Sequence, residues 1–306
     1  MGNDKDLLSI ANLTSEQVRQ LVEDGVQIKQ ERSSRVLDGK IIALLFEKPS
    51  LRTKSSFEVG IRQLGGQAVY FGRDEVGLGV RESVADVTRV LERMFDGIVA
   101  RVFDHAKLEE MAKYARIPVV NALSDAEHPC QALADLVTLQ ENFGELGGKR
   151  VVFVGDGNNI AVSLGFACAS VGTDYVVASP PGYRIPDGVW KKMSQRAQSS
   201  GSRMEWVERP QDAVRDADCV YTDVWTSMGQ EAEQAKRLKA FGGYQVNPEL
   251  MKLAKPNAVF MHDMPAHEGE EISKGMLDHP QSVAFDQAEN RLHAQKAVLA
   301  WLYSND

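Results

Sequence analysis

Between Phe46 and Phe57 the chain reads FEKPSLRTKSSF, where an apolar run breaks at Pro49 and a helical pattern begins. Residues 41–46 are apolar throughout, as in a buried strand, and apolar residues recur at helical spacing after the break. The pattern therefore predicts a strand, a short turn and a helix that starts near Ser50. The free amides and the positive dipole end of such a helix favour an anion.

The side chains at this helix start suit a phosphate group. Ser50 and Thr53 offer hydroxyl donors, and the planar guanidinium of Arg52 can bind phosphate oxygens in pairs. Serine and threonine also cap many helices for stability alone. The stretch by itself therefore leaves ordinary N-capping open as an explanation.

A second polar cluster, HPCQ at residues 128–131, follows a strand-like run at 117–123 and opens another amphipathic run. His128 can donate to a carbonyl oxygen, and the amide of Gln131 can both accept and donate. A lone histidine is more often a structural residue, so the interpretation of His128 depends on the other polar segments of the chain. Three more polar segments each follow an apolar, strand-like run, at residues 154–159, 223–229 and 261–267.

The composition indicates a globular chain with more than one domain, because 306 residues exceed the usual single-domain size. Forty-three acidic against 35 basic residues give a net charge of −8, so nothing suggests nucleic-acid binding. Three scattered cysteines fit a reducing compartment better than a disulfide framework, and none has metal-ligand spacing. Without a signal-peptide pattern or a run of transmembrane length, we expect a cytoplasmic protein with no membrane partner.

Two successive series of alternating strands and helices are predicted, separated by the glycine-rich stretch 144–149. The first series has strands at 41–46, 67–71, 98–103 and 119–123, with helices near 15–31, 84–93, 108–115 and 129–143. The second has strands at 150–154, 175–178, 203–207, 219–223 and 258–262, with helices near 161–170, 189–199, 213–216, 247–253 and 287–303. Such alternation predicts parallel sheets covered by helices, with ligands beyond the carboxyl ends of the strands.

In order and spacing, these motifs resemble the ornithine transcarbamylases (ornithine carbamoyltransferases) of the aspartate/ornithine carbamoyltransferase superfamily. The resemblance runs from Ser50 to AENRLHAQK at 288–296, and the DxxxSMG stretch at 223–229 is of the ornithine type. It implies an α/β fold of two domains, each a mostly parallel sheet covered by helices, with the active site in the cleft between them. Residues 1–145, joined by the C-terminal helix 287–306, would bind carbamoyl phosphate, and residues 146–286 would bind ornithine.

The activity implied is transfer of the carbamoyl group of carbamoyl phosphate to the side-chain amine of L-ornithine, giving L-citrulline and phosphate in arginine biosynthesis. No metal or organic cofactor is implied. The family's catalytic unit is a homotrimer, so we expect a trimer or a multiple of trimers. In the glycine-punctuated loop 75–83, Arg81 would then reach a neighbour's phosphate.

The resemblance also assigns site residues. The carbamoyl phosphate set is Ser50, Leu51, Arg52, Thr53, Arg101, His128, Gln131, Met264 and Arg291; the ornithine set is Asn159, Asp223, Ser227 and Met228; and the catalytic residues are Arg101, His128 and Asp263. Taken singly, Arg101 and Arg291 are more commonly explained by surface salt bridges, and Met228 by core packing. The turn at 155–159 lacks the third glycine of a dinucleotide fingerprint.

Two positions depart from the family pattern. Lys54 stands where the phosphate motif usually has arginine, which keeps the charge but loses the bidentate fork. Asp263 and Met264 stand where the ornithine enzymes have cysteine and leucine. A carboxylate at 263 would hold the substrate ammonium more tightly, or would accept its proton as a general base. A transcarbamylase for another amine, such as putrescine or an acylated ornithine, and a weakly active ligand-binding paralogue are the alternatives.

Overall fold

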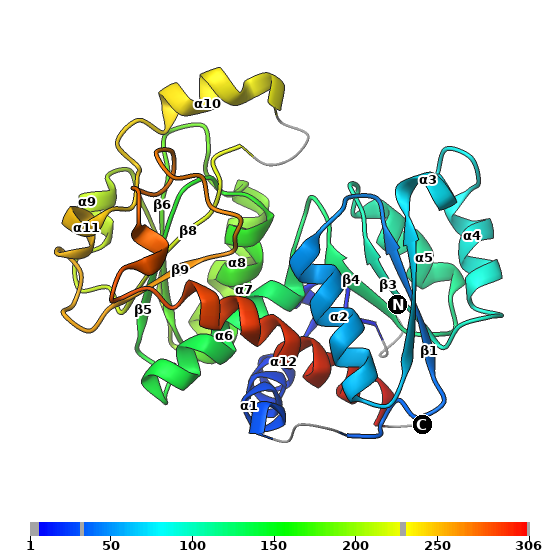
Figure 1. The fold of residues 1–306 in the computed structure, drawn as a ribbon. Coiled ribbons are helices and arrows are strands. Elements are labelled where there is room, and N and C mark those ends of the chain that lie inside the picture. Colours follow the sequence, from blue (N-terminus) through cyan, green and yellow to red (C-terminus); the bar gives the residue numbers. More distant parts are fainter. Residues whose placement is uncertain (1–5, 31–33, 227–230, 305–306) are drawn as a thin grey trace. The chain divides into compact units, whose positions relative to one another are not determined.

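The structure is a computed structural model that describes residues 6–30, 34–226 and 231–304. The chain divides into two compact units, Met1–Val137 with Glu289–Asp306, and Thr138–Ala288 (Figure 1). The two divisions fall inside the long helices α6 (Pro129–Phe143) and α12 (Ala284–Tyr303).

The first unit contains a parallel four-stranded sheet in the order β2-β1-β3-β4. Its strands are β1 (Ile41–Phe46), β2 (Gln67–Gly72), β3 (Gly97–Arg101) and β4 (Val119–Leu123). Its helices, besides α6 and α12, are η1 (Ile10–Asn12), α1 (Ser15–Gln30), α2 (Leu51–Gln63), α3 (Arg73–Val76), α4 (Val84–Leu91) and α5 (Ala106–Tyr114).

One face of this sheet packs on α4 and α5. Ala43 and Leu45 of β1 share a buried cluster with Val87 of α4 and Met111 of α5. Burial of these apolar side chains stabilises the layer by about 25 cal/mol per Å² removed from water. Because side chains alternate along a strand, Leu44 points to the opposite face.

The last helix closes against the start of β3. The hydroxyl of Tyr303 donates to the carbonyl of Asp96 at 2.7 Å. A Cβ on Gly97, the first residue of β3, would clash with that hydroxyl. Glycine at 97 is therefore required by the close approach of α12.

The second unit contains a parallel five-stranded sheet in the order β7-β6-β5-β8-β9. Its strands are β5 (Arg150–Val154), β6 (Asp174–Ala178), β7 (Met204–Val207), β8 (Cys219–Thr222) and β9 (Val259–His262). Its helices are α7 (Asn159–Val171), α8 (Asp187–Ser200), α9 (Pro210–Ala213), η2 (Glu231–Glu233), α10 (Gln234–Ala240), α11 (Pro248–Met251) and η3 (Met276–Asp278).

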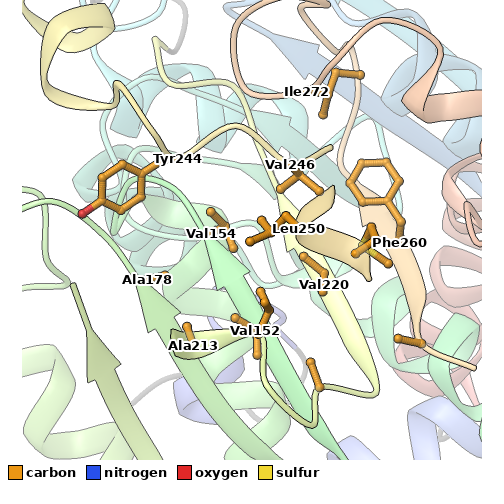
Figure 2. Close-up of a cluster of buried hydrophobic side chains, with 14 of the residues drawn as sticks. Val152, Val154, Ala178, Ala213, Val220, Tyr244, Val246, Leu250, Phe260 and Ile272 are labelled. Atoms are coloured by element: carbon orange, nitrogen blue, oxygen red, sulfur yellow. The ribbon is translucent and has the colours of Figure 1, made fainter. Parts of the chain in front are cut away.

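The two faces of the second sheet are covered differently. Figure 2 shows one face, where Val152, Val220 and Phe260 pack against Leu250 of α11. Tyr175 of β6 points to the other face, because its neighbour Val176 belongs to this cluster. There the Tyr175 hydroxyl donates to the carbonyl of Ala161 in α7 at 2.9 Å.

The predicted fold class, two helix-covered parallel sheets, is confirmed, and most predicted elements end within a few residues of the observed ones. The predicted helix at 213–216 is wrong. Pro210 starts α9 earlier, as proline does at a first helical position, and Asp216 has a left-handed φ of 58° that ends any helix there. The helix α10 was not predicted. Within the described ranges, no helix has both the length and the apolar character needed to cross a membrane.

Candidate active site

The candidate residues of the first unit gather where the strand order reverses. β1 and β3 are neighbours, yet the chain extends the sheet from β1 to β2 on one side and from β3 to β4 on the other. Open α/β sheets bind ligands at such switch points, beyond the carboxyl ends of the strands. Phe46 and Arg101 are paired at those ends, so the sheet topology brings the start of α2 close to Arg101.

Thr53 is the shared contact of this site. Its Oγ1 accepts from Arg101 Nη1 at 3.2 Å and from Arg291 Nη2 at 2.5 Å. Ser50 caps α2, since its Oγ accepts from the Thr53 amide at 3.3 Å and donates to Thr53 Oγ1 at 3.0 Å. Two guanidinium groups therefore converge at a helix start, and both effects favour an anion.

His128 is buried beside these arginines. Its Nε2 lies 3.3 Å from Arg291 Nη2, and a guanidinium only donates, so Nε2 accepts and the neutral ring carries its proton on Nδ1. Burial and the charges of Arg291 and Arg101 lower the pKa of His128 well below its ordinary value. In this arrangement the expected donation to a substrate carbonyl requires either the Nδ1 proton or the other tautomer.

The remaining predicted residues of the first unit differ in exposure. Gln131 is buried and donates from Nε2 to Asp135 Oδ1 at 2.8 Å, and in the described part of the chain no hydrogen bond reaches its Oε1. Leu51 is exposed at the first position of α2, and Arg52 is half-buried. Lys54, which stands where the family motif usually has arginine, holds its ammonium 3.8 Å from the centroid of the Tyr70 ring, in a cation–π contact.

The second sheet repeats the arrangement at its own switch point, between β5 and β8. Asn158 follows β5 and Asp223 follows β8, and Asn158 Nδ2 donates to Asp223 Oδ2 at 2.9 Å. Asn158 Oδ1 also caps α7, accepting from the amides of Ile160 and Ala161. The resemblance assigned Asn159 to the ornithine set, and Asn158 was not predicted, although asparagine directly before a helix is a standard capping signal. Asn159 is the half-buried first residue of α7.

Two carboxylates lie at neighbouring strand ends in this unit. Thr222 and His262 form the last registered pair of β8 and β9, so Asp223 and Asp263 follow on adjacent strands. Asp223 is 7% exposed. Its burial and the negative charge of Asp263 raise the pKa of Asp223 to about 7. Such a pair favours a cationic ligand.

The segment after β9 is held by a buried hydrogen-bond chain. His262 Nδ1 accepts from the amide of Met264 at 2.8 Å, so its proton lies on Nε2, which contacts Glu271 Oε1 at 3.0 Å. Glu271 also accepts from the amide of His267 at 2.5 Å. Met264 itself has a left-handed φ of 50°, which this chain of bonds helps to hold. Nothing in the sequence marked Glu271 in advance.

Several further predicted residues carry less structural information. Ser227 and Met228 lie outside the described residues. Arg81 is exposed, with Nη2 lying 3.6 Å from Glu82 Oε1, in a loop where Val80 is 92% exposed.

One group of side chains in the described ranges has the donor types of a metal site: His267, Glu270 and Glu271, whose ligand atoms lie within 4.8 Å of one another. His267 is exposed, and Glu271 already accepts hydrogen bonds from His262 and from the amide of His267. We assign this group no function.

Comparison with known proteins identifies both halves of the chain. Residues 5–141 match the carbamoyl-P binding domain of the aspartate/ornithine carbamoyltransferases, and residues 147–302 match their Asp/Orn binding domain. The anabolic ornithine carbamoyltransferase of Pyrococcus furiosus is 50% identical over 300 residues, which cover 97% of this chain and 95% of that protein. A solved structure of the enzyme from that organism has a TM-score of 0.93 at 50% identity, covering 96% of each chain.

A solved N-acetyl-L-ornithine transcarbamylase is also similar, at 30% identity and a TM-score of 0.88, covering 97% of this chain and 99% of that one. Likeness of fold alone therefore does not separate amine substrates. The family, in contrast, follows from matches that span nearly the whole length. This chain belongs to the aspartate/ornithine carbamoyltransferase family.

Proposed function

We propose that this protein is an ornithine carbamoyltransferase, which transfers the carbamoyl group of carbamoyl phosphate to the side-chain amine of L-ornithine and releases L-citrulline and phosphate. The observation that carries the proposal is the convergence of Arg101 and Arg291 on Thr53 at the start of α2. The 50% identity to enzymes of that name supports ornithine as the amine.

Carbamoyl phosphate binds in the first unit. The amides of the α2 start and the side chains of Ser50, Arg52 and Thr53 hold the phosphate, with Leu51 contributing its backbone. Arg101, Arg291 and His128 surround the carbonyl oxygen. The unoccupied acceptor Oε1 of Gln131 suits the carbamoyl N–H groups.

The chemistry needs charge stabilisation at one oxygen. The amine attacks the carbonyl carbon, the carbonyl oxygen gains negative charge, and the bond to the phosphate oxygen then breaks. Arg101 and Arg291 are already held at the site by Thr53, so they stabilise the developing charge with little reorganisation. A donor of this kind typically contributes about 3 kcal/mol to the barrier reduction.

Ornithine binds in the second unit. Asp223, oriented by Asn158, accepts the α-ammonium, and Asn159 with the amides at the α7 start takes the carboxylate. Ser227 and Met228 belong to the proposed set by resemblance. Asp263 contacts the side-chain amine, and the carbonyl of Met264 accepts from the carbamoyl nitrogen.

We also propose a cytoplasmic homotrimer, or a multiple of trimers, that works in arginine biosynthesis without a cofactor. The exposed loop around Val80 and Arg81 suits contact with a second subunit. The biosynthetic direction is proposed from the relative of Pyrococcus furiosus, which is named an anabolic ornithine carbamoyltransferase. Light scattering at assay concentration tests the assembly, and an active monomer would contradict it.

The decisive experiment compares amines. Purified protein with carbamoyl phosphate should form citrulline from ornithine, and far less product from putrescine or N-acetyl-ornithine at equal concentration. Putrescine lacks the α-carboxylate, and the acetyl group removes the charge that Asp223 would accept. If ornithine gives no citrulline while another amine is carbamoylated, the rival suggested by Asp263 replaces this proposal.

A further inference from the structure

Arg237, on α10, is a buried cation outside the proposed substrate-binding set. Its side chain is only 8% exposed. Burying a guanidinium is costly unless the group is paired and hydrogen-bonded. Its partners therefore indicate what the residue does.

Arg237 joins two separate turns of the second unit. Its Nη1 donates to Asp156 Oδ2 at 2.6 Å and to the carbonyl of Trp225 at 3.0 Å. Asp156 lies in the turn after β5, and Trp225 lies in the segment after β8. Its Nε donates to Glu233 Oε2 at 3.2 Å, within the same helical segment.

The same two turns carry the pair proposed to hold ornithine. Asn158 comes two residues after Asp156, and Asp223 comes two residues before Trp225. The turns are thus bonded twice, directly by Asn158 to Asp223 and indirectly through Arg237.

The turn after β5 has little freedom to relax on its own. Gly157 donates its amide to the carbonyl of Tyr183 at 2.8 Å, and a Cβ at 157 would overlap the backbone of Ile185. The guanidinium of Arg237 lies 5.2 Å from the centroid of the Tyr183 ring. Arg237 therefore contacts both the turn and the segment behind it.

Aromatic packing fixes the helix that carries Arg237. Phe241, the residue after α10, is fully buried and stacks on Trp225, with ring centroids 5.6 Å apart and planes at 16°. Its ring also lies 4.9 Å from that of Tyr183. A helix as short as α10 is not stable alone, so these contacts set where Arg237 reaches.

We propose that Arg237 is a positioning residue for the amino-acid substrate, clamping the turn after β5 to the segment after β8 so that Asn158 and Asp223 keep the spacing that binds the α-ammonium. This rests on the proposed function of that pair. Arg237 makes no substrate contact of its own in this scheme. Small misplacements of binding groups are enough to lower activity strongly.

Both the charge and the planar shape of the Arg237 guanidinium contribute to the clamp. Burial raises the pKa of Asp156, and Arg237 opposes that rise through its hydrogen bond and its charge. Lysine at 237 would keep the charge but lose the fork that reaches two acceptors at once.

The test uses L-norvaline, which has the α-carbon groups of ornithine but no side-chain amine, so it binds without reacting. Its affinity for the intact protein in the presence of carbamoyl phosphate is measured by calorimetry. Arg237→Gln should weaken norvaline binding at least tenfold and raise the KM for ornithine similarly, while the KM for carbamoyl phosphate changes less than twofold. Arg237→Lys should have a norvaline affinity and a KM for ornithine between those of the wild type and Arg237→Gln.

Lys239→Gln is the matched control, because it removes the same charge from an exposed position of the same helix. It should leave both affinities unchanged. Asp156→Asn breaks the clamp from its other end. The double variant with Arg237→Gln should therefore bind norvaline no more weakly than the weaker-binding single variant.

Unchanged norvaline affinity in Arg237→Gln would overturn the inference, as would equal losses for both substrates alongside a lowered melting temperature. Should Arg237→Gln fail to fold, Arg237→Lys and Asp156→Asn give the same comparison. Failure of the proposed function would give a different experimental result. Wild-type protein would then bind norvaline yet form no citrulline, and the variants would still report on the clamp.

Discussion

The switch point of the first sheet carries Arg101 and Thr53, whereas that of the second sheet carries Asn158 and Asp223. In both units the reversal of strand order opens a place beyond the strand ends where side chains from two loops meet. The first is lined by guanidinium groups and the second by carboxylates. Topology sets the location of each site, and the side chains set the sign of its ligand.

The two sites also differ in how firmly their charge is fixed. Arginine does not lose its proton in proteins, so the charge at Thr53 is constant across the physiological pH range. Asp223 has a pKa of about 7, so its charge changes within that range. The pH dependence of substrate binding should therefore reside mainly in the second unit.

The largest expected effect comes from the first site. Arg101→Ala should lower kcat by about 100- to 1000-fold, the typical loss when one donor to a developing oxyanion is removed. Steady-state kinetics with circular dichroism as a fold check measures it. Arg116→Ala is the control, because Arg116 is largely exposed. A loss below threefold would remove Arg101 from the catalytic set.

The matching change in the second site should act on binding. Asp223→Asn should raise the KM for ornithine about 10- to 100-fold, since a charge-assisted hydrogen bond is worth about 1.5–3 kcal/mol. The KM for carbamoyl phosphate should change little. Asp212→Asn, at a partly exposed position, serves as the control. Equal effects on both substrates would break the assignment of separate ligands to the two switch points.

The same variant should be more stable than wild type at alkaline pH. The pKa of Asp223 is raised on folding, from 3.8 to about 7, so its contribution to stability is fully present below about pH 4 and is lost as the pH rises through 7. Above that, the buried charge costs on the order of a few kcal/mol. Urea unfolding at pH 5 and pH 8 should show the gain of Asp223→Asn growing with pH. A gain that shrinks with pH would contradict the raised pKa.

Binding of norvaline should follow the same titration. Ionised Asp223 holds the α-ammonium, so affinity should increase by several-fold between pH 6 and pH 8 in the presence of carbamoyl phosphate. Asp223→Asn should flatten this dependence. A flat wild-type profile would mean that another group binds the ammonium.

Sequence patterns predicted most strands because the parallel sheets are buried and their strands are largely continuous apolar runs, as at 151–154. They also placed Thr53 at a helix start that follows a strand, whereas the assignment of Arg101 to the site came from the resemblance. Asn158 was not among the predicted residues, because the resemblance assigned Asn159 and only the capping geometry shows that Asn158 lies at the start of α7.

Arg237 and Glu271 were beyond sequence reasoning for a different reason. Arg237 contacts Asp156, which lies 81 residues away. Glu271 contacts His262, nine residues earlier at the end of β9, through a fold of the chain that no local pattern indicates. Each also has a charged residue directly before it in the sequence, Lys236 and Glu270 respectively, so no periodic pattern indicates its burial. Such pairings become visible only when the strands have been placed side by side.

The smallest expected effect concerns Asp263, which distinguishes the second site from the ornithine enzymes it resembles. Its negative charge raises the pKa of Asp223 and would also raise that of a substrate amine beside it. Asp263→Cys should therefore increase turnover with ornithine a few-fold near neutral pH and shift the rising limb of the pH profile to lower pH. Norvaline titrations should show the Asp223 midpoint moving the same way. If the variant instead loses turnover while norvaline still binds, the carboxylate is accepting the proton of the attacking amine, and the second site supplies a general base as well as a binding charge.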